Sequence, residues 1–122
     1  MPPYIVPYVR RCKKNIHGDF PDEGYDVVGH GIIELNPMEM KIYDGNGYEP
    51  TSSLPVLCIR LTSITAIDFT RFRSLFGNFR GGAARIDAVF VTNNKKTTER
   101  LTLKMPLDEY SRFRNDIKEL LQ

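Results

Sequence analysis

The 122-residue sequence is poor in the residue types that most often carry catalysis or bind metals. It has no tryptophan, two histidines and two cysteines, Cys12 and Cys58. It contains no phosphate-binding glycine loop, no Cys-x-x-Cys pair, no His-Glu-x-x-His motif and no nucleophile elbow. His17 and His30 lie in or beside turns and have no clustered ligand partner. We therefore expect no catalytic residue, no metal and no cofactor.

Long apolar runs are also absent, since none approaches the roughly 20 residues that cross a bilayer. The first four residues lack the charged and apolar regions of a signal peptide, which favours a cytoplasmic protein with free thiols. An excess of one charge is missing too, because 17 Lys and Arg face 15 Asp and Glu, a net charge of +2. This balance argues against nucleic-acid binding. Because no apolar run is long enough to cross a bilayer, we expect any membrane contact to be peripheral.

The sequence does contain the two-residue alternation of apolar and polar side chains that is typical of β-strands. Its length suits a single domain over residues 1–122. Asn36-Pro37 and residues 93–96 read as hairpin turns, and Pro7 suggests an edge or a bulge in the first strand. Strands are expected over residues 4–12, 25–35, 39–44, 55–61, 85–92 and 97–105. The strand over 55–61, or its neighbour, is expected to continue through Phe69.

After Pro106 the period changes to that of a helix, predicted over residues 107–121. Asp108 and Glu109 would lie in its first turn, where the helix dipole favours acidic side chains. The apolar stripe of such a helix must be buried against another element, and the open end of a barrel of strands provides one. We therefore predict a mostly β (α+β) fold, a pleckstrin-homology-like barrel of two orthogonal antiparallel sheets with six or seven strands, capped by this helix. The alternative is a generic α+β sheet with the helix on one face.

Three segments carry a family resemblance: Gly-His-Gly-Ile-Ile-Glu-Leu at residues 29–35, Glu-Met-Lys-Ile-Tyr at 39–43 and Leu-Cys-Ile-Arg at 57–60. They resemble phosphotyrosine-binding (PTB) domains of the insulin-receptor-substrate type. The resemblance implies that a peptide is added as a strand between the strand over residues 85–92 and the C-terminal helix. Arg60 matches one of the family's phosphotyrosine-binding arginines, and Lys95 and Lys96 stand where the family has another.

The resemblance places a peptide groove beside the C-terminal helix. The residues expected to bind the peptide are Arg60, Arg85, Val89, Val91, Lys95, Lys96, Tyr110 and Phe113. The alternative for Tyr110 and Phe113 is burial in the core. Lysine presents a point charge where arginine offers a planar fork, so Lys95 and Lys96 differ from the family in how they would meet a phosphate. The chain also inserts about 20 residues, 65–84, where the family has a short connection.

That insertion is the most unusual segment, with four phenylalanines and three arginines between residues 69 and 80. Phe69, Phe72, Phe76 and Phe79 have helical spacing, which predicts a short amphipathic helix. Such a helix would cover an open barrel end or rest on an anionic membrane; the ordinary alternative is core aromatics between solvated charges. The candidate lipid-binding residues are Arg10, Arg11, Lys13, Lys14, Arg71, Arg73 and Arg80.

The leading hypothesis is a non-catalytic adaptor module that binds a peptide segment of a protein partner, with or without phosphate. The first alternative is a peripheral membrane domain that binds phosphoinositides or other anionic lipids. The second is a structural domain within a larger assembly. Salt separates the first two, because electrostatic membrane binding weakens steeply as salt rises, whereas strand addition depends little on it.

Overall fold

The computed structural model describes residues 2–14, 17–18, 25–28, 30–73 and 80–122. These residues form nine strand segments, one 3₁₀ helix and one α-helix. The elements are β1 (Tyr4–Val6), β2 (Tyr8–Lys13), β3 (Tyr25–Val28), β4 (Gly31–Leu35), β5 (Glu39–Asp44), β6 (Leu57–Arg60), η1 (Leu61–Ser63), β7 (Ile64–Arg73), β8 (Arg80–Thr92), β9 (Lys95–Pro106) and α1 (Leu107–Leu120).

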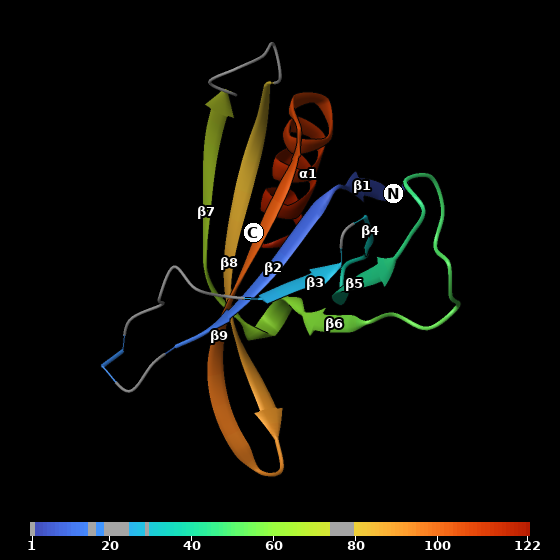
Figure 1. Cartoon of the computed structure of the whole chain (residues 1–122). Helices are drawn as coiled ribbons and strands as arrows, with labels where there is room; N and C mark the ends of the chain where they lie inside the picture. Colours follow the sequence, from blue (N-terminus) through green and yellow to red (C-terminus); the bar gives the residue numbers. More distant parts are fainter. Residues whose placement is uncertain (1, 15–16, 19–24, 29, 74–79) are drawn as a thin grey trace.

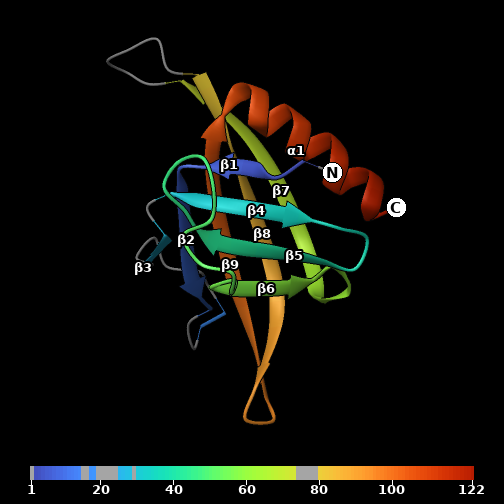
Figure 2. The ribbon, with the colours of Figure 1, turned by 90° about the vertical axis from the view of Figure 1, so that its right-hand side faces the viewer.

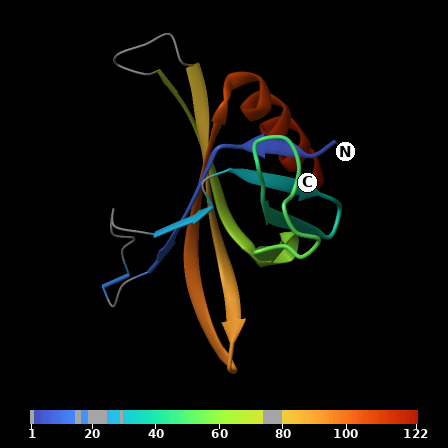
Figure 3. The same cartoon turned by 45° about the vertical axis from the view of Figure 1, so that its right-hand side comes forward.

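The strands form two antiparallel sheets, with the orders β1-β4-β5-β6 and β3-β2-β9-β8-β7. Figure 1 shows the tall ribbon of β7, β8 and β9 beside α1, and Figure 2 shows the strands of the smaller sheet running across it. The helix covers the end of the space between the sheets (Figure 3). This arrangement confirms the predicted mostly β fold, a pleckstrin-homology-like barrel capped by a C-terminal helix.

Two of the predicted strands are bent, and each contributes to both sheets. The first divides at Pro7 into β1, which pairs with β4, and β2, which pairs with β9. The second divides between β3 and β4, which are separated by residues 29–30. Strands that switch sheets at a bend make the corners of orthogonal barrels, and proline suits such a point because it cannot donate to a ladder. Counted with their bends, the nine segments are seven strands, within the predicted six or seven.

Both predicted hairpins are present, and asparagine side chains or backbones make their turns. Asn36 Oδ1 accepts hydrogen bonds from the backbone N–H groups of Met38 and Glu39, at 2.8 and 2.9 Å, between β4 and β5. Asn93 and Asn94 have positive φ angles of 51° and 64° between β8 and β9. Two consecutive positive φ values are typical of the two-residue type I′ turn, whose twist matches that of the paired strands.

The predicted amphipathic helix in the insertion is wrong where the structure describes it. Phe69 and Phe72 lie in β7, opposite Ala84 and Gly81 of β8. Phe76 and Phe79 lie outside the described residues. Helical spacing was misleading because a three-residue step places two side chains on opposite faces of a strand, and pairing with β8 determines the conformation. The described part of the insertion therefore consists of β7 and the first residues of β8, which extend the larger sheet.

The core lies between the two sheets and under α1. On the helix, Tyr110, Phe113 and Ile117 are buried, with at most 2% of each side chain exposed. The Phe113 ring meets the Tyr4 ring edge to face, with centroids 5.3 Å apart. Asp108 and Glu109 occupy the first turn as predicted. The apolar stripe of the helix thus joins β1 to the larger sheet.

Polar side chains of α1 close the outer edge of β1. Glu109 Oε2 accepts a hydrogen bond from the backbone N–H of Ile5 at 3.0 Å. Arg112 donates to the backbone carbonyl oxygens of Pro2 and Pro3, both at 2.8 Å. An exposed strand edge offers unpaired backbone groups to other chains. Here the helix engages the N–H of Ile5 and the two carbonyl groups just before β1, so it obstructs strand addition at this edge.

The side chain of Tyr4 adds a further contact between β1 and α1. Its hydroxyl donates a hydrogen bond to Asp116 Oδ2, and the Arg112 guanidinium lies 4.0 Å from the centroid of its ring. Burial, followed by the hydrogen bond to Asp116, raises the pKa of the Tyr4 hydroxyl above its ordinary value of 10.0. The hydroxyl therefore remains a hydrogen-bond donor at neutral pH, and the bond between β1 and α1 is kept.

Gly82 provides a test of how closely the helix approaches β8. A Cβ at this position would lie 2.1 Å from Cδ2 of Tyr110, whose buried ring also contacts Phe69. Because the ring has little room to move, we expect Gly82→Ala to lower the free energy of unfolding by about 1–3 kcal/mol. Urea unfolding followed by circular dichroism measures the change. The same substitution in a Tyr110→Leu background should cost less, and an equal cost in both backgrounds would contradict the proposed clash.

Candidate functional site

The sheet orders leave β1, β6, β3 and β7 at the edges of the sheets. Of these, β1 is obstructed by α1 as described above. The longest is β7, whose ten residues pair with β8 on one side only, among the residues that the structure describes. In Figure 2 β7 crosses behind α1, and in Figure 1 β8 lies between β7 and the helix, so it is side chains that connect β7 with α1. An unpaired strand edge beside a helix is suited to main-chain pairing with an extended peptide.

Phe69 connects β7 to the helix. Its ring meets that of Tyr110 edge to face, with centroids 6.2 Å apart. The Arg114 guanidinium and the Lys118 ammonium group lie 5.8 and 5.4 Å from the Phe69 centroid. The positions 110, 114 and 118 follow one another at four-residue steps, so they share one face of α1. This face of α1 and β7 together form a surface that we call the shelf. The rings of Phe69 and Tyr110 form its base, and Arg114 and Lys118 lie over the Phe69 ring.

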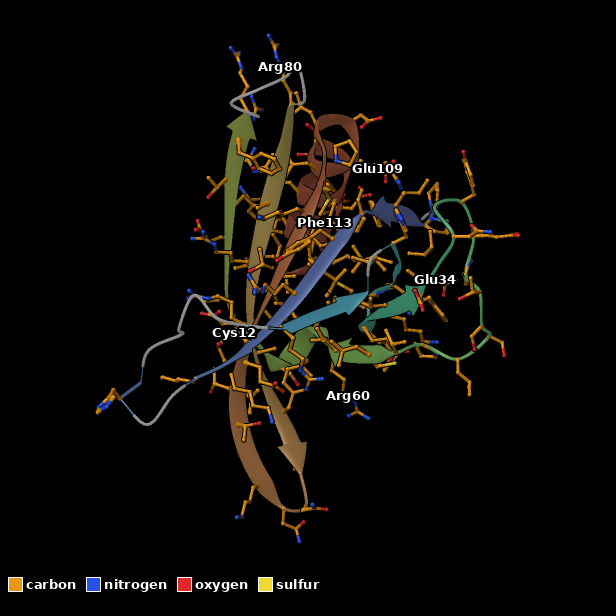
Figure 4. The ribbon with its side chains drawn as sticks, in the orientation of Figure 1. Cys12, Glu34, Arg60, Arg80, Glu109 and Phe113 are labelled. Atoms are coloured by element: carbon orange, nitrogen blue, oxygen red, sulfur yellow. The ribbon has the colours of Figure 1, made fainter. Side chains whose placement is uncertain are left out.

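A cavity of about 310 Å³ continues the shelf toward the N-terminal end of α1, and β7, β8 and the helix all line it. Arg71, Arg73 and Arg80 are exposed there, and no acidic partner is found for them among the described residues. Figure 4 shows Arg80 projecting at the free end of the sheet. We call this surface the β7 edge site; it comprises Phe69, Arg71, Phe72, Arg73, Arg80, Leu107, Arg114 and Lys118.

The predicted groove along residues 85–92 is not the open edge beside the helix. Over residues 80–88, β8 lies between β7 and β9, so β7 occupies the position where a peptide was expected to pair. Tyr110 and Phe113 are buried core residues rather than walls of an open groove. The helical spacing of the phenylalanines hides the strand character of β7, so the sequence does not show that this edge of β8 is occupied.

The other predicted peptide-site residues lie in three places. Arg60, Val89 and Val91 line one cavity between β6 and β8. Lys95 and Lys96 are exposed at the start of β9, and Lys96 is opposite Val91. Arg85 lines a different cavity, with Asp68, Asp87 and Arg100. The structure thus brings together Arg60, Val89 and Val91 of the predicted peptide site, but α1 does not line their cavity.

The candidate lipid-binding residues are divided between two ends of the larger sheet. Lys13 on β2 is opposite Glu99, which is itself opposite Ala88, whereas Arg73 is opposite Arg80. Eight residues of β8 separate Arg80 from Ala88, roughly 27 Å at about 3.4 Å per residue. Arg10, Arg11 and Lys14 belong with the Lys13 end of this set. The two basic clusters therefore do not form one surface.

Arg11 has a structural partner. Its Nε and Nη2 bond to Oε1 and Oε2 of Glu99, at 2.8 and 2.5 Å, and its guanidinium lies 4.9 Å from the Phe90 centroid. Glu99 is 1% exposed. The ion pair therefore links β2 to β9. The Arg11 guanidinium is already used in this structural contact, which makes it a poor candidate for binding a lipid headgroup.

The β7 edge site contains residues that sequence reasoning missed. Arg114 and Lys118 lie four and eight residues after Tyr110, a helical pattern visible in the sequence, but nothing local indicates that this face lies beside β7. No protein-family model matches the chain, and no curated protein matches it. Within the described ranges, no helix is long and apolar enough to span a membrane, and no three His, Cys, Asp or Glu side chains gather as metal ligands. The geometry therefore carries the functional argument.

Proposed function

We propose that the chain is a non-catalytic, intracellular interaction module, similar to PTB domains, that binds an extended acidic peptide segment of a protein partner by strand addition to β7 beside α1. The open edge of β7 next to the basic face of the helix is the observation that carries this proposal. Main-chain hydrogen bonds would supply affinity, and the shelf would select side chains. A phosphorylated residue would satisfy the same charge requirement.

The charge of the site supports an acidic ligand. Arg71, Arg73 and Arg80 lie at one end of the shelf, and Arg114 and Lys118 lie along it.

A second candidate function is the binding of anionic lipid headgroups. The specific observation in its favour is the exposed cluster of Arg71, Arg73 and Arg80 beside Phe72 at the free end of the larger sheet. This cluster would act without the Lys13 end of the sheet, which lies too far along β8 to join it. Vesicle binding through the cluster would weaken steeply between low and physiological salt.

Charge reversal in the β7 edge site tests the peptide proposal. An array of synthetic peptides of about ten residues, the length of a long strand, provides the probes, and fluorescence anisotropy measures the affinity of those selected. We expect acidic peptides to be selected. We expect Arg71→Glu/Arg73→Glu to weaken their binding about tenfold, because two attractive charge pairs become repulsive and tenfold corresponds to about 1.4 kcal/mol.

The matched control is Lys95→Glu/Lys96→Glu, which makes the same charge change at the opposite hairpin tip. This variant should bind the selected peptides like the unmodified protein. Equal weakening by both double variants would indicate a general charge effect and would contradict the site. If no peptide binds while vesicles of anionic lipid bind with steep salt dependence, the membrane function replaces the peptide function.

A further inference from the structure

The loop between β5 and β6 passes across the outer face of the smaller sheet, the face turned away from the core (Figure 2). Ile32 and Tyr43 lie on this face, because they alternate with the core residues Ile33 and Ile42. They are nevertheless only 1% and 8% exposed. The start of the loop packs on them, since a Cβ on Gly45 would lie 2.8 Å from Ile32 Cγ1. This part of the outer face is therefore covered.

Hydrogen bonds hold the loop in place. The backbone N–H of Gly45 donates to the carbonyl oxygen of His30 at 2.8 Å, and that of Thr51 donates to the carbonyl oxygen of Asp44 at 2.9 Å. Within the loop, Asn46 Oδ1 accepts two backbone N–H groups, both at 3.0 Å. A ligand that enters between the loop and the sheet meets walls that are already formed, which lowers the entropic cost of binding.

A cavity of about 410 Å³ lies between this loop and the sheet. The sheet contributes Glu34 of β4 and Tyr43 of β5, and the loop contributes residues 50–53. Figure 4 shows Glu34 on the side of the smaller sheet that carries the loop. We call this surface the Glu34 cavity. None of its lining residues belongs to the β7 edge site.

Two hydroxyl groups of the cavity have their protons engaged within the protein. The Tyr43 hydroxyl donates to Glu34 Oε2 at 3.2 Å, and the Thr51 hydroxyl donates to the backbone carbonyl oxygen of Asp44 at 3.1 Å. An ionised carboxylate and a carbonyl oxygen can only accept, so the direction of both bonds is fixed. Each of these hydroxyl oxygens can therefore only accept a further hydrogen bond.

The charge of the cavity is negative. Lys41 is directly opposite Glu34, but its Nζ lies 3.4 Å from a carboxylate oxygen of Glu39, and Glu34 makes no ion pair in the described part of the chain. None of the described side chains that line the cavity is basic or carries an amide. The cavity thus presents one carboxylate and two hydroxyl oxygens to a ligand, and all three are acceptors.

A primary ammonium group matches this set of acceptors. It has three N–H donors and no acceptor, and its positive charge complements Glu34. The hydroxyl of a neutral sugar supplies a single donor and no charge, so it matches the cavity less well. Pro50 in the cavity wall provides apolar surface for the methylene stem of an alkylammonium ligand.

We propose that the Glu34 cavity binds a primary alkylammonium group, supplied by a lysine side chain of a partner protein or by a free polyamine. The ammonium group donates to the Glu34 carboxylate, the Tyr43 hydroxyl and the Thr51 hydroxyl. This site lies on the smaller sheet and shares no residue with the β7 edge site. Failure of one site in experiment therefore leaves the other standing.

The test titrates ¹⁵N-labelled protein with Nα-acetyl-lysine N-methylamide and follows the backbone amide signals by NMR. We expect saturable shifts at Tyr43 and Thr51 with a Kd of about 1 mM, a value in reach of a ligand with so few atoms. The Nε-acetyl derivative has lost the charge and should not bind. The Nε-trimethyl derivative keeps the charge but has no N–H donor on this group, so its Kd should be at least about tenfold higher.

A parallel titration with 1,5-diaminopentane separates the two sources of the ammonium group. Tighter binding than that of the lysine probe indicates a free polyamine, because the second ammonium group then finds a partner as well. Equal or weaker binding indicates the side chain of a partner protein. Both results support an ammonium site.

Substitutions locate the binding. Glu34→Gln should raise the Kd of the lysine probe about tenfold, and Thr51→Val should raise it about threefold, since each removes an acceptor. Lys41→Met removes the basic side chain opposite Glu34 and should lower the Kd about twofold, a gain that a damaged fold would not produce. The matched control is Glu119→Gln, which changes an exposed carboxylate of α1 and should leave the Kd unchanged.

The proposal is overturned if no saturable shift occurs up to about 20 mM lysine probe, or if the Nε-acetyl derivative binds equally well. It is also overturned if Glu34→Gln binds like the unmodified protein. Equal weakening by Glu34→Gln and Glu119→Gln would indicate a general effect of net charge and would count against the cavity.

Discussion

Phe113→Ala is expected to lower the free energy of unfolding by about 3–5 kcal/mol, the usual cost of removing a fully buried aromatic ring. Phe113 is 0% exposed and meets Tyr4 edge to face at 5.3 Å. Its loss leaves a cavity where α1, β1 and the core meet, and the closely packed neighbours can fill it only in part. Small domains are stable by only about 5–15 kcal/mol, so the variant should unfold at much lower urea concentration.

Leu121→Ala is the control, because Leu121 follows the same helix and is 36% exposed. Its cost should stay within about 0.5 kcal/mol. Both variants are compared by urea unfolding with circular dichroism. Equal midpoints would show that α1 does not contribute its buried stripe to the core in solution.

Arg11→Met should also cost about 3–5 kcal/mol, for an electrostatic reason. Glu99 is 1% exposed, and Arg11 binds both of its carboxylate oxygens. Methionine keeps much of the side-chain volume but leaves a buried carboxylate without its partner. The free energy of unfolding, measured in urea at neutral pH, gives the loss.

Two further variants isolate the cause. In Arg11→Met/Glu99→Leu the buried charge is gone, so most of the lost stability should return. Lys41→Met breaks the exposed pair with Glu39, whose side chains are 34% and 30% exposed, and should change stability by about 0.5 kcal/mol or less. If the double variant is less stable than Arg11→Met alone, the unpaired carboxylate is not the source of the loss.

The elements that the sequence predicted well are those specified by neighbouring residues. The turn at Asn36, the turn at Asn93-Asn94 and the helix after Pro106 depend on local backbone preferences and on side-chain periodicity. The bends within the first two strands could not be predicted, because they follow from pairing each half with a different sheet. Pro7 gave a hint of the first bend and nothing more.

The candidate site was harder to predict, for a related reason. The helical stripe of Tyr110 and Phe113 indicates that one face is buried but not which strand it covers. The role of β7 follows from its pairing with β8, which overrides the helical spacing of Phe69 and Phe72. Arg60 and Val91 are 31 positions apart in the chain, and only the crossing of the two sheets brings them to one groove.

The bond between Tyr4 and Asp116 joins residues 112 positions apart, and β2 pairs with residues 99–104 of β9. Such distant partners make loop closure slow, in contrast to the local β8–β9 hairpin. On the ribosome, β1 and β2 leave the exit tunnel first, yet their partners in β9 and α1 are synthesised last. The barrel can therefore close only after almost the whole domain has emerged, and until then β1 and β2 can pair only with β4 and β3.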